Sequence, residues 1–378
     1  MAPDYDVIIA GLGAMGSAAA YHLAKTGRHV LGLDRFEPPH QFGSSHGLTR
    51  IIREAYFEHP LYVPLVQRAY ELWADLEKQS GQKLLLQTSG LMLGRPDGVL
   101  VRGARRSAEE HHLKHRVLSC DDMRREFPMF QLPPDMVAVW EPRAGILFPE
   151  AAIRTHIASA RAHGAELVIN SPVEKWEPET GGVRVHAASG VYTARQILLS
   201  PGAWMTSLAP DLKLPLAVER QVLCWFQPRS EPGLFSPQRC PIFICEHQPG
   251  RFFYGFPDLG DGVKIGVHHE GAMASPDRLD RQVKDRETEI ALSLLRQFLP
   301  RAAGPVRSAM VCMYTNTPDE HFLLDWHPHS PQVLIASPCS GHGFKFSPVI
   351  GELAASLLSG ARSPFDLSLF RLDKHLGT

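Results

Sequence analysis

The sequence predicts an α/β protein in which a Rossmann-like domain is combined with a second, α+β domain built on an antiparallel sheet. Three observations support this prediction. A strand–helix–strand pattern occupies residues 5–34, and short alternating strands such as "RQVLCWFQ" and "RFFYGFPD" recur in residues 84–140 and 215–305. The chain of 378 residues, 44% of them hydrophobic, is also long enough for two or three domains with a large core.

The N-terminal pattern predicts each element of a βαβ unit in turn. The apolar run of residues 5–10 predicts a strand, and the alanine-rich residues 14–25 predict a helix that ends at Gly27. A second strand then reaches Asp34. Further on, residues 167–199 show short strands separated by Gly-Gly and Ser-Gly turns, with an apolar strand at residues 196–199.

The glycines between the first strand and the helix have the spacing of a dinucleotide-binding turn. Gly11 would allow the tight turn, Gly13 would let a pyrophosphate approach the backbone, and Gly16 would let the helix pack closely on the strand. Asp34 is placed to accept hydrogen bonds from ribose hydroxyls. The pattern predicts dinucleotide binding, but it fits FAD and NAD equally well.

The next segment, "GSSHGLTRIIREAY" at residues 43–56, differs from an ordinary dehydrogenase, which would continue with a helix and a third parallel strand. Its small polar residues suit a backbone that passes a flat, polar ring system, although a solvated loop is an equal alternative. If this segment is helical, Arg50 and Arg53 share one face.

Composition narrows the class of ligand and partner. A net charge of -1 gives no long-range field to attract nucleic acid, an anionic membrane or an acidic protein. Asp4 and Asp6 stand where a secretory signal needs positive charge, and no apolar run approaches the roughly 18 residues of a membrane span. We therefore expect a cytoplasmic protein that binds a small molecule and has no obligate protein partner. The six cysteines lack metal-site or disulfide spacing, so no metal is expected.

Four further segments carry a more specific signal: "SSHGLTRIIREAY", "YGFPDLGDGVKIGVHHEG", "CMYTNTPDEHFLLD" and "SGHGFKFSPVIGE". With the glycine turn, they resemble the monomeric sarcosine oxidase family of flavin amine oxidases, which includes N-methyltryptophan oxidase and pipecolate oxidase. The resemblance runs through essentially the whole chain. Two positions, Pro201 and Pro338, depart from it, because similar proteins tend to have small residues there.

The resemblance implies a fold with two discontinuous domains. Residues 1–83, 141–214 and 306–378 would form a glutathione-reductase-like FAD-binding domain. Residues 84–140 and 215–305 would form a substrate-binding domain whose sheet roofs the flavin.

The resemblance also assigns roles to Cys312 and to three cations. An isolated cysteine between Val311 and Met313 is by itself more typical of an inert core thiol. In the family, however, this cysteine forms a thioether with the 8-methyl group of FAD, so Cys312 would be the covalent anchor. Arg53 and Lys345 would hold the substrate carboxylate, and Arg50 would lie against the flavin. One guanidinium and one ammonium converging on an anion suit an α-amino acid better than a simple amine.

Lys264 and His268 are four residues apart, so they would lie on the same face of a strand, with Gly266 leaving open space between them. They could instead line the solvent side of a sheet. The resemblance places Lys264 near flavin N5, where a cation stabilises developing superoxide, and His268 at the substrate amine. Tyr254 and Tyr314 would form walls of the pocket, although buried tyrosines are commonly structural.

Further cofactor contacts are implied for residues in the segments named above, with Val173 near the adenine and Lys345 also touching the cofactor. They are Ser44, His46, Thr49, Val173 and Gly343.

The expected function is that of an FAD-dependent oxidase of secondary amino acids such as sarcosine or N-methyl-L-tryptophan. A hydride equivalent would pass to flavin N5, and O2 would be reduced to H2O2. Three alternatives stay open: an oxidase of L-pipecolate or another cyclic imino acid, an NAD-linked dehydrogenase, and a flavin-binding subunit without catalytic activity.

Overall fold

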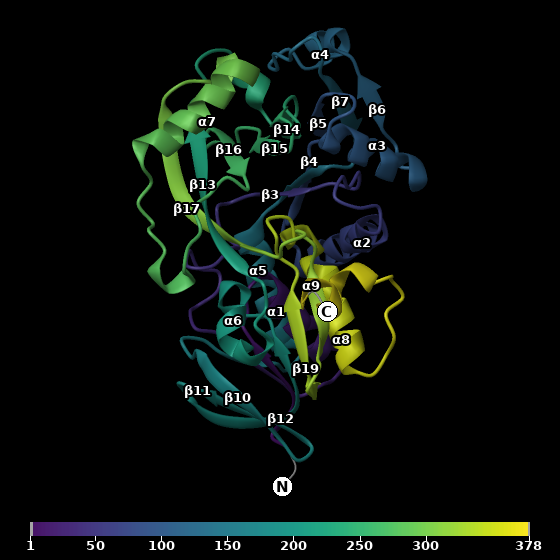
Figure 1. Ribbon diagram of the computed structural model, residues 1–378, viewed down its shortest axis with the longest axis vertical. Coiled ribbons are helices and arrows are strands. Elements are labelled where there is room, and N and C mark those ends of the chain that lie inside the picture. The colour runs from purple at the N-terminus through teal and green to yellow at the C-terminus, as the bar shows by residue number, and fades with distance from the viewer. Residues whose placement is uncertain (1–2, 377–378) are drawn as a thin grey trace.

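The computed structural model describes residues 3–376 and contains two large sheets, one above the other in Figure 1. The N-terminus lies at the lower sheet, and the upper sheet carries α4 (Cys120–Glu126) and α7 (Asp285–Phe298) at its far end. Segments far apart in the sequence alternate between the two sheets, so the chain crosses from one to the other several times.

The first sheet has eight strands and is built on parallel pairing of β1 with β2 and β12. Its strand order is β10-β11-β12-β1-β2-β9, and β19 pairs with β12 and with β18. The strands are β1 (Tyr5–Ala10), β2 (Val30–Leu33), β9 (Glu166–Val168), β10 (Val173–Glu179), β11 (Gly182–Ala187), β12 (Gly190–Leu199), β18 (Leu323–His327) and β19 (Ser330–Ser337).

Four helices cover this sheet or flank it: α1 (Ala14–Lys25), α2 (Tyr62–Ser80), α5 (Pro149–Ala162) and α8 (Ser347–Leu358). Helix α1 lies against α5 and α8. Small residues permit the close approach, because a Cβ atom added at Gly351 would lie 2.6 Å from the backbone of Ala18. The buried apolar side chains of β1, β2, α1, α2 and α8 form the core that holds the first turn of α1 in place.

The second sheet also has eight strands, in the order β17-β13-β16-β15-β14-β5-β7-β6, and only the β14–β5 pair is parallel. Its strands are β5 (Gly90–Gly94), β6 (Arg116–Leu118), β7 (Val137–Glu141), β13 (Ala217–Phe226), β14 (Ile242–Gln248), β15 (Arg251–Phe256), β16 (Val263–His268) and β17 (Val306–Asn316). A small sheet joins β3 (Arg50–Ile52), β8 (Gly145–Leu147) and β4 (Leu85–Gln87), and the remaining helices are α3 (Val99–Glu110), α6 (Met205–Leu208) and α9 (Leu372–Leu376).

The predicted N-terminal βαβ unit is confirmed, with β1 and α1 at the expected residues and β2 ending one residue before Asp34. The expected strand at residues 196–199 is the end of the longer β12. The helical alternative for Arg50 and Arg53 is wrong. The β-branched Ile51 and Ile52 instead form the short strand β3, which pairs antiparallel with β8.

One expected domain boundary does not coincide with the sheets. The resemblance places residues 306–316 in the FAD-binding domain, and in the structure they form β17, which pairs along most of its length with β13 of the second sheet. The reason is the long antiparallel register from Ala217 opposite Asn316 to Phe226 opposite Val306. The division into two domains otherwise stays a prediction.

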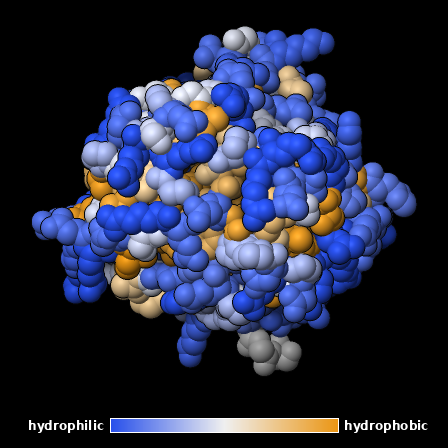
Figure 2. Space-filling model, turned by 90° about the horizontal axis from the view of Figure 1, so that it is seen from above, coloured by the Kyte–Doolittle hydropathy of each residue, from blue (hydrophilic) through white to orange (hydrophobic). Residues whose placement is uncertain are grey.

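The surface of the upper end is largely polar. Seen from above, hydrophilic side chains cover most of this face, and hydrophobic ones gather in a central band between them (Figure 2). Within residues 3–376, no helix combines the length and the apolar character needed to cross a membrane.

Candidate active site

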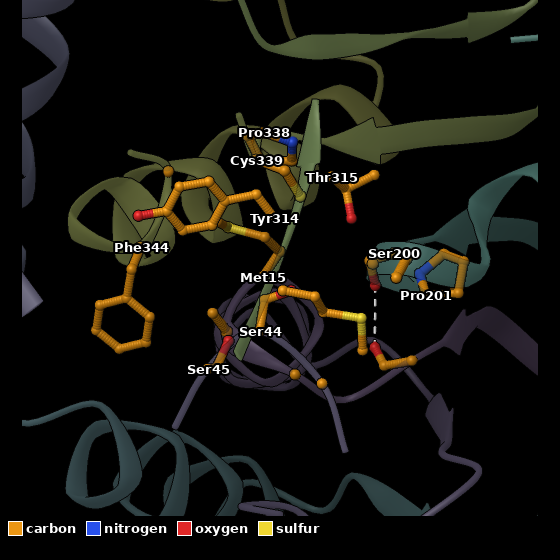
Figure 3. Close-up of a pocket in the computed structure, with 18 of the residues that line it drawn as sticks. Met15, Ser44, Ser45, Ser200, Pro201, Tyr314, Thr315, Pro338, Cys339 and Phe344 are labelled. Carbon is orange, nitrogen blue, oxygen red and sulfur yellow. Dashed lines mark hydrogen bonds between the residues drawn. The ribbon is translucent and has the colours of Figure 1, made fainter. Parts of the chain in front are cut away.

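A cavity of about 490 Å³ is lined by residues of both large sheets and of the loops between them. Figure 3 shows residues 44–45, 200–201, 314–315 and 338–339 arranged around it, with α1 seen nearly end-on behind them. Pro201 and Pro338, the two departures from the family pattern, both line it. The cavity therefore lies where the N-terminal glycine turn meets the second sheet.

The glycine turn has the shape that a dinucleotide requires. Gly11 has a φ of +96°, and a Cβ atom there would lie 2.6 Å from the carbonyl oxygen of Ser200. At Gly16 a Cβ atom would lie 1.8 Å from the carbonyl oxygen of Gly11. Gly13, which caps α1, has no atom within 4 Å of an added Cβ and lines the cavity. The free N–H groups of α1 thus face open space, which fits a pyrophosphate.

Asp34 lies beside this turn and is 7% exposed. Its carboxylate accepts hydrogen bonds from the backbone N–H groups of Leu12 (2.6 Å) and Phe36 (2.8 Å). Burial raises the pKa of Asp34, and the two backbone donors oppose that shift. Because each carboxylate oxygen has two lone pairs, capacity for further donors such as ribose hydroxyls is left. The residues present therefore fit FAD, although they do not themselves distinguish it from another dinucleotide.

The loop before β3 brings Cys312 beside a cation. Arg50 donates hydrogen bonds to the carbonyl oxygens of Ser44 (2.7 Å) and Thr49 (2.8 Å). The Sγ atom of Cys312, on β17, lies 3.9 Å from Arg50 Nη2 and 3.6 Å from the Ser44 carbonyl oxygen. Ser44 and Arg50 line the cavity, whereas Cys312 lies directly behind them and is 2% exposed.

His46, in the same loop, is buried without a hydrogen-bond partner for either ring nitrogen among the described residues. Burial, followed by the charge of Arg50, lowers the pKa of His46 to about 3. The imidazole is therefore neutral at physiological pH.

Lys264 lies on β16 behind the same loop. Its Nζ atom donates to the carbonyl oxygens of Gly47 (2.6 Å) and Thr49 (3.1 Å) and to Thr49 Oγ1 (2.8 Å), which are enough acceptors for all three ammonium protons. Burial, with a contribution from Arg50, lowers the pKa of Lys264 well below its usual range. A second, small cavity of about 20 Å³ is lined by Lys264 and Thr49.

The open space expected at Gly266 is not there. A Cβ atom at Gly266 would lie 2.6 Å from the hydroxyl oxygen of Tyr254, so the tyrosine ring fills that space. The glycine is required because β15 places Tyr254 directly opposite it. Lys264 and His268 still lie on the same strand, but Lys264 contacts the loop at residues 47–49, whereas His268 lines the large cavity.

A buried cluster of cations and one carboxylate forms another wall of the cavity. Arg53 Nη2 lies 2.7 Å from both carboxylate oxygens of Glu58, and Arg53 Nη1 donates to the Ala55 carbonyl oxygen (2.9 Å). Lys345 donates to the carbonyl oxygen of His342 (2.7 Å) and contacts the Tyr56 hydroxyl (3.3 Å). Arg53, Glu58, His342 and Lys345 all line the cavity.

Charge within this cluster is strongly coupled. Burial, followed by Arg53, lowers the pKa of Lys345 to about 7, although Glu58 opposes the shift. Burial would by itself raise the pKa of Glu58, but Arg53, His342 and Lys345 together hold it below its usual value. Glu58 is therefore an anion held against two basic side chains.

His268, Tyr314 and Tyr254 form a hydrogen-bonded row beside this cluster. His268 Nδ1 lies 3.2 Å from the Tyr314 hydroxyl, which lies 3.4 Å from that of Tyr254. All three line the cavity. Burial, followed by nearby basic groups, lowers the pKa of His268 well below its usual range, so its imidazole is neutral.

Most of the residues singled out from the sequence meet at the large cavity: Gly11, Gly13, Asp34, Ser44, Arg50, Arg53, Val173, Tyr254, His268, Tyr314, Gly343 and Lys345. Those that lie behind its lining are Gly16, His46, Thr49, Lys264 and Cys312.

Two residues of this cluster, Glu58 and His342, were not predicted from the sequence. Both stand in or directly beside quoted segments, but nothing in their spacing indicates contact with Arg53 and Lys345.

Comparison with known proteins agrees with this geometry. The profile of a family described as FAD dependent oxidoreductase matches residues 6–357. The chain is 44% identical to a monomeric sarcosine oxidase of Streptomyces avermitilis, over 98% of this chain and 97% of that protein. It is 37% identical to an N-methyl-L-tryptophan oxidase of Yersinia pestis, over 98% and 99% of the two chains.

Among solved structures, NikD, described as an unusual amino acid oxidase essential for nikkomycin biosynthesis, matches with a TM-score of 0.85 at 23% identity. The match covers 97% of each chain. This likeness shows the fold. Family membership follows from the extent of the family match and from the sequence identity to the oxidases. The chain belongs to the FAD dependent oxidoreductase family, in the group of the monomeric sarcosine oxidases.

Proposed function

We propose that this protein is an FAD-dependent oxidase of secondary amino acids, with N-methyl amino acids as substrates. The observation that carries the proposal is the position of Arg53 and Lys345. Both line the same cavity as the glycine turn, and together they offer a guanidinium and an amine to an anionic ligand. Named relatives act on sarcosine or N-methyl-L-tryptophan, which are secondary amino acids with a carboxylate.

The turn at Gly11 and Gly13 and the carboxylate of Asp34 would hold the dinucleotide part of FAD. When bound, FAD would take up two electrons and, in total, two protons from the C–H and N–H bonds of an amine, which becomes an imine, and would pass them to O2 to give H2O2. Cys312 would tether the flavin. The place of Cys312 directly behind the cavity lining, with its Sγ atom 3.9 Å from Arg50 Nη2, supports this.

In the free protein Glu58 occupies two of the hydrogen-bonding positions of Arg53. A substrate carboxylate would have to share or replace this contact, with Lys345 as the second cation. The His268 imidazole is neutral and its Nε2 atom has no hydrogen-bond partner among the described residues. It would therefore bind the substrate nitrogen without repelling it and favour the unprotonated amine that oxidation requires.

Lys264 would assist the step with oxygen. Its three acceptors fix the amino group, and in its protonated form this group would stabilise the negative charge that O2 acquires during reduction. The cytoplasmic location expected from the sequence stays part of this proposal.

The test is a substrate survey with two readouts. Sarcosine, N-methyl-L-tryptophan, L-pipecolate and the amines without their carboxylates are supplied to the purified protein. We expect the amino acids to bleach the flavin absorbance without air and to generate H2O2 in air, and the amines to do neither well. Bleaching without H2O2 would contradict an oxidase, and turnover of the amines at equal rates would contradict the carboxylate contact.

A further inference from the structure

The loop at residues 269–284, which connects β16 to α7, leaves the second sheet and reaches the first. In Figure 1 it is the green loop that extends downwards from α7 along the side of the molecule. It contains a short 3-10 turn at Pro276–Arg278. Two side chains of this loop, Asp277 and Arg281, contact the segments that follow β2 and β12.

Asp277 joins two segments of the first sheet. Its Oδ1 atom accepts hydrogen bonds from Arg35 Nη1 (2.5 Å) and Trp204 Nε1 (2.8 Å). The guanidinium of Arg35 also lies over the Trp204 ring, 5.3 Å from its centre. Since Arg35 follows β2 and Trp204 follows β12, one carboxylate links the segments that follow two strands on either side of β1. The hydrogen bond from Trp204, and then Arg35, lower the pKa of Asp277, so it is an anion at neutral pH.

Arg281 contacts residues 41–42, which lie further along the segment that follows β2. It donates to the backbone carbonyl oxygens of Gln41 (2.7 Å) and Phe42 (2.9 Å), and its guanidinium lies 5.4 Å from the centre of the Phe42 ring. Phe42 in turn stacks on Phe36 at a centroid distance of 4.6 Å. The contacts of Arg281 therefore fix the backbone and an aromatic pair of residues 36–42.

The loop is also fastened at its other side. Arg220 of β13 donates to the carbonyl oxygens of Asp280 and Gln282, each at 2.7 Å, and pairs with Glu287 of α7. The loop thus bridges the second sheet and the segment that follows β2.

This bridge closes one end of the large cavity. Arg35, Phe36, Trp204 and Asp277 line the cavity together with Val173, and Arg35 and Phe36 directly follow Asp34 in the chain. If the turn holds the pyrophosphate and Asp34 the ribose hydroxyls, this end receives the adenosine half of FAD.

We propose that residues 276–281 are a clasp that closes the adenosine end of the cavity, with Asp277 and Arg281 as positioning residues for FAD. The clasp does not touch the region of Arg53, Lys345 and His268. It therefore acts on the binding of the adenosine half and leaves the substrate contacts unchanged.

The individual contacts are exposed, and the side chains of Asp277 and Arg35 are 57% and 42% exposed. Single exposed ion pairs contribute little to stability, so the effect on FAD binding depends on the contacts of Asp277 and Arg281 acting together. We expect roughly a five- to thirtyfold loss of FAD affinity when Asp277 and Arg281 are both removed.

The test compares FAD with FMN, which lacks the adenosine half. The full chain carries Cys312→Ala so that flavin binds reversibly, and dissociation constants are measured from flavin fluorescence. Asp277→Ala/Arg281→Ala is compared with Arg278→Ala, a control at an exposed neighbour whose side chain makes no hydrogen bond or ion pair with the described residues. We expect the double variant to weaken FAD and leave FMN within about twofold, and the control to change neither.

Equal losses for FAD and FMN, or unchanged FAD affinity, would overturn the clasp. If Cys312→Ala protein does not fold, hydrogen exchange in the flavin-loaded protein with Cys312 in place decides instead. Opening of the clasp would speed exchange in residues 36–42 of the double variant, and unchanged exchange would count against it. If neither the Cys312→Ala parent nor either variant binds FAD, that result contradicts the proposed cofactor, on which the clasp proposal rests.

Discussion

The buried pair of Arg53 and Glu58 allows a sharp test of carboxylate recognition. Arg53 is 1% exposed and shares two hydrogen bonds with Glu58. Arg53→Ala alone would remove a substrate contact and also leave the Glu58 carboxylate buried without its main partner. The double variant Arg53→Ala/Glu58→Gln removes both charges and so separates the two effects.

The expected magnitudes follow from burial. Breaking a buried ion pair by removing one partner typically costs about 3–5 kcal/mol of stability, so Arg53→Ala should lower the melting temperature markedly. Losing one side of a desolvated charge contact with the substrate costs roughly 2–5 kcal/mol, or about 30- to 5,000-fold in kcat/KM. The double variant should regain most of the stability and keep the kinetic loss.

The assay measures kcat/KM for an N-methyl amino acid and for its decarboxylated analogue, at matched flavin content, in native protein and the two variants. The amine should react slowly with every form and change little between native protein and the double variant. If the double variant recovers turnover of the amino acid, Arg53 serves Glu58 alone, and the carboxylate contact is refuted.

Three other predictions concern Cys312, Lys264 and Lys345. Acid should precipitate the flavin colour with the native polypeptide and leave it in solution for Cys312→Ala; free flavin from native protein would exclude a tether. Lys264→Met should keep reduction by substrate but slow reoxidation about a hundredfold or more, and unchanged stopped-flow reoxidation would remove Lys264 from the oxygen step. Because the pKa of Lys345 is about 7, its charge is present below that pH and lost above it. The affinity of a simple carboxylate inhibitor should therefore fall as pH rises through about 7 and vary less in Lys345→Met; a flat native profile would contradict a charged contact.

The βαβ unit could be predicted to within one residue because most of its signals are local. Gly16 must clear the carbonyl oxygen of Gly11, only a few residues earlier, and the alanines of α1 favour the helix by themselves. The short β3 is different, because Arg50–Ile52 forms a strand only through pairing with β8, almost a hundred positions further along the chain.

Site residues could be predicted from the sequence where they stand in a recognisable motif. Contacts between segments that are far apart in the sequence could not be predicted. Arg53 and Lys345 stand in quoted motifs, but their coupling through Glu58 depends on how residues 53–58 fold against residues 342–345. The expectation of open space at Gly266 was wrong for the same reason, since the Tyr254 side chain fills that space from the neighbouring strand.

The place of β17 has a consequence for assembly and unfolding. Cys312 belongs to the second sheet through its pairing with Gln221, whereas the glycine turn that would cradle the dinucleotide follows the first strand of the first sheet. A flavin attached to Cys312 would be a cross-link between the two sheets that no peptide bond provides. The bond could form only after both sheets had folded and met. Once formed, this bond would make the two sheets unfold together, as one cooperative unit.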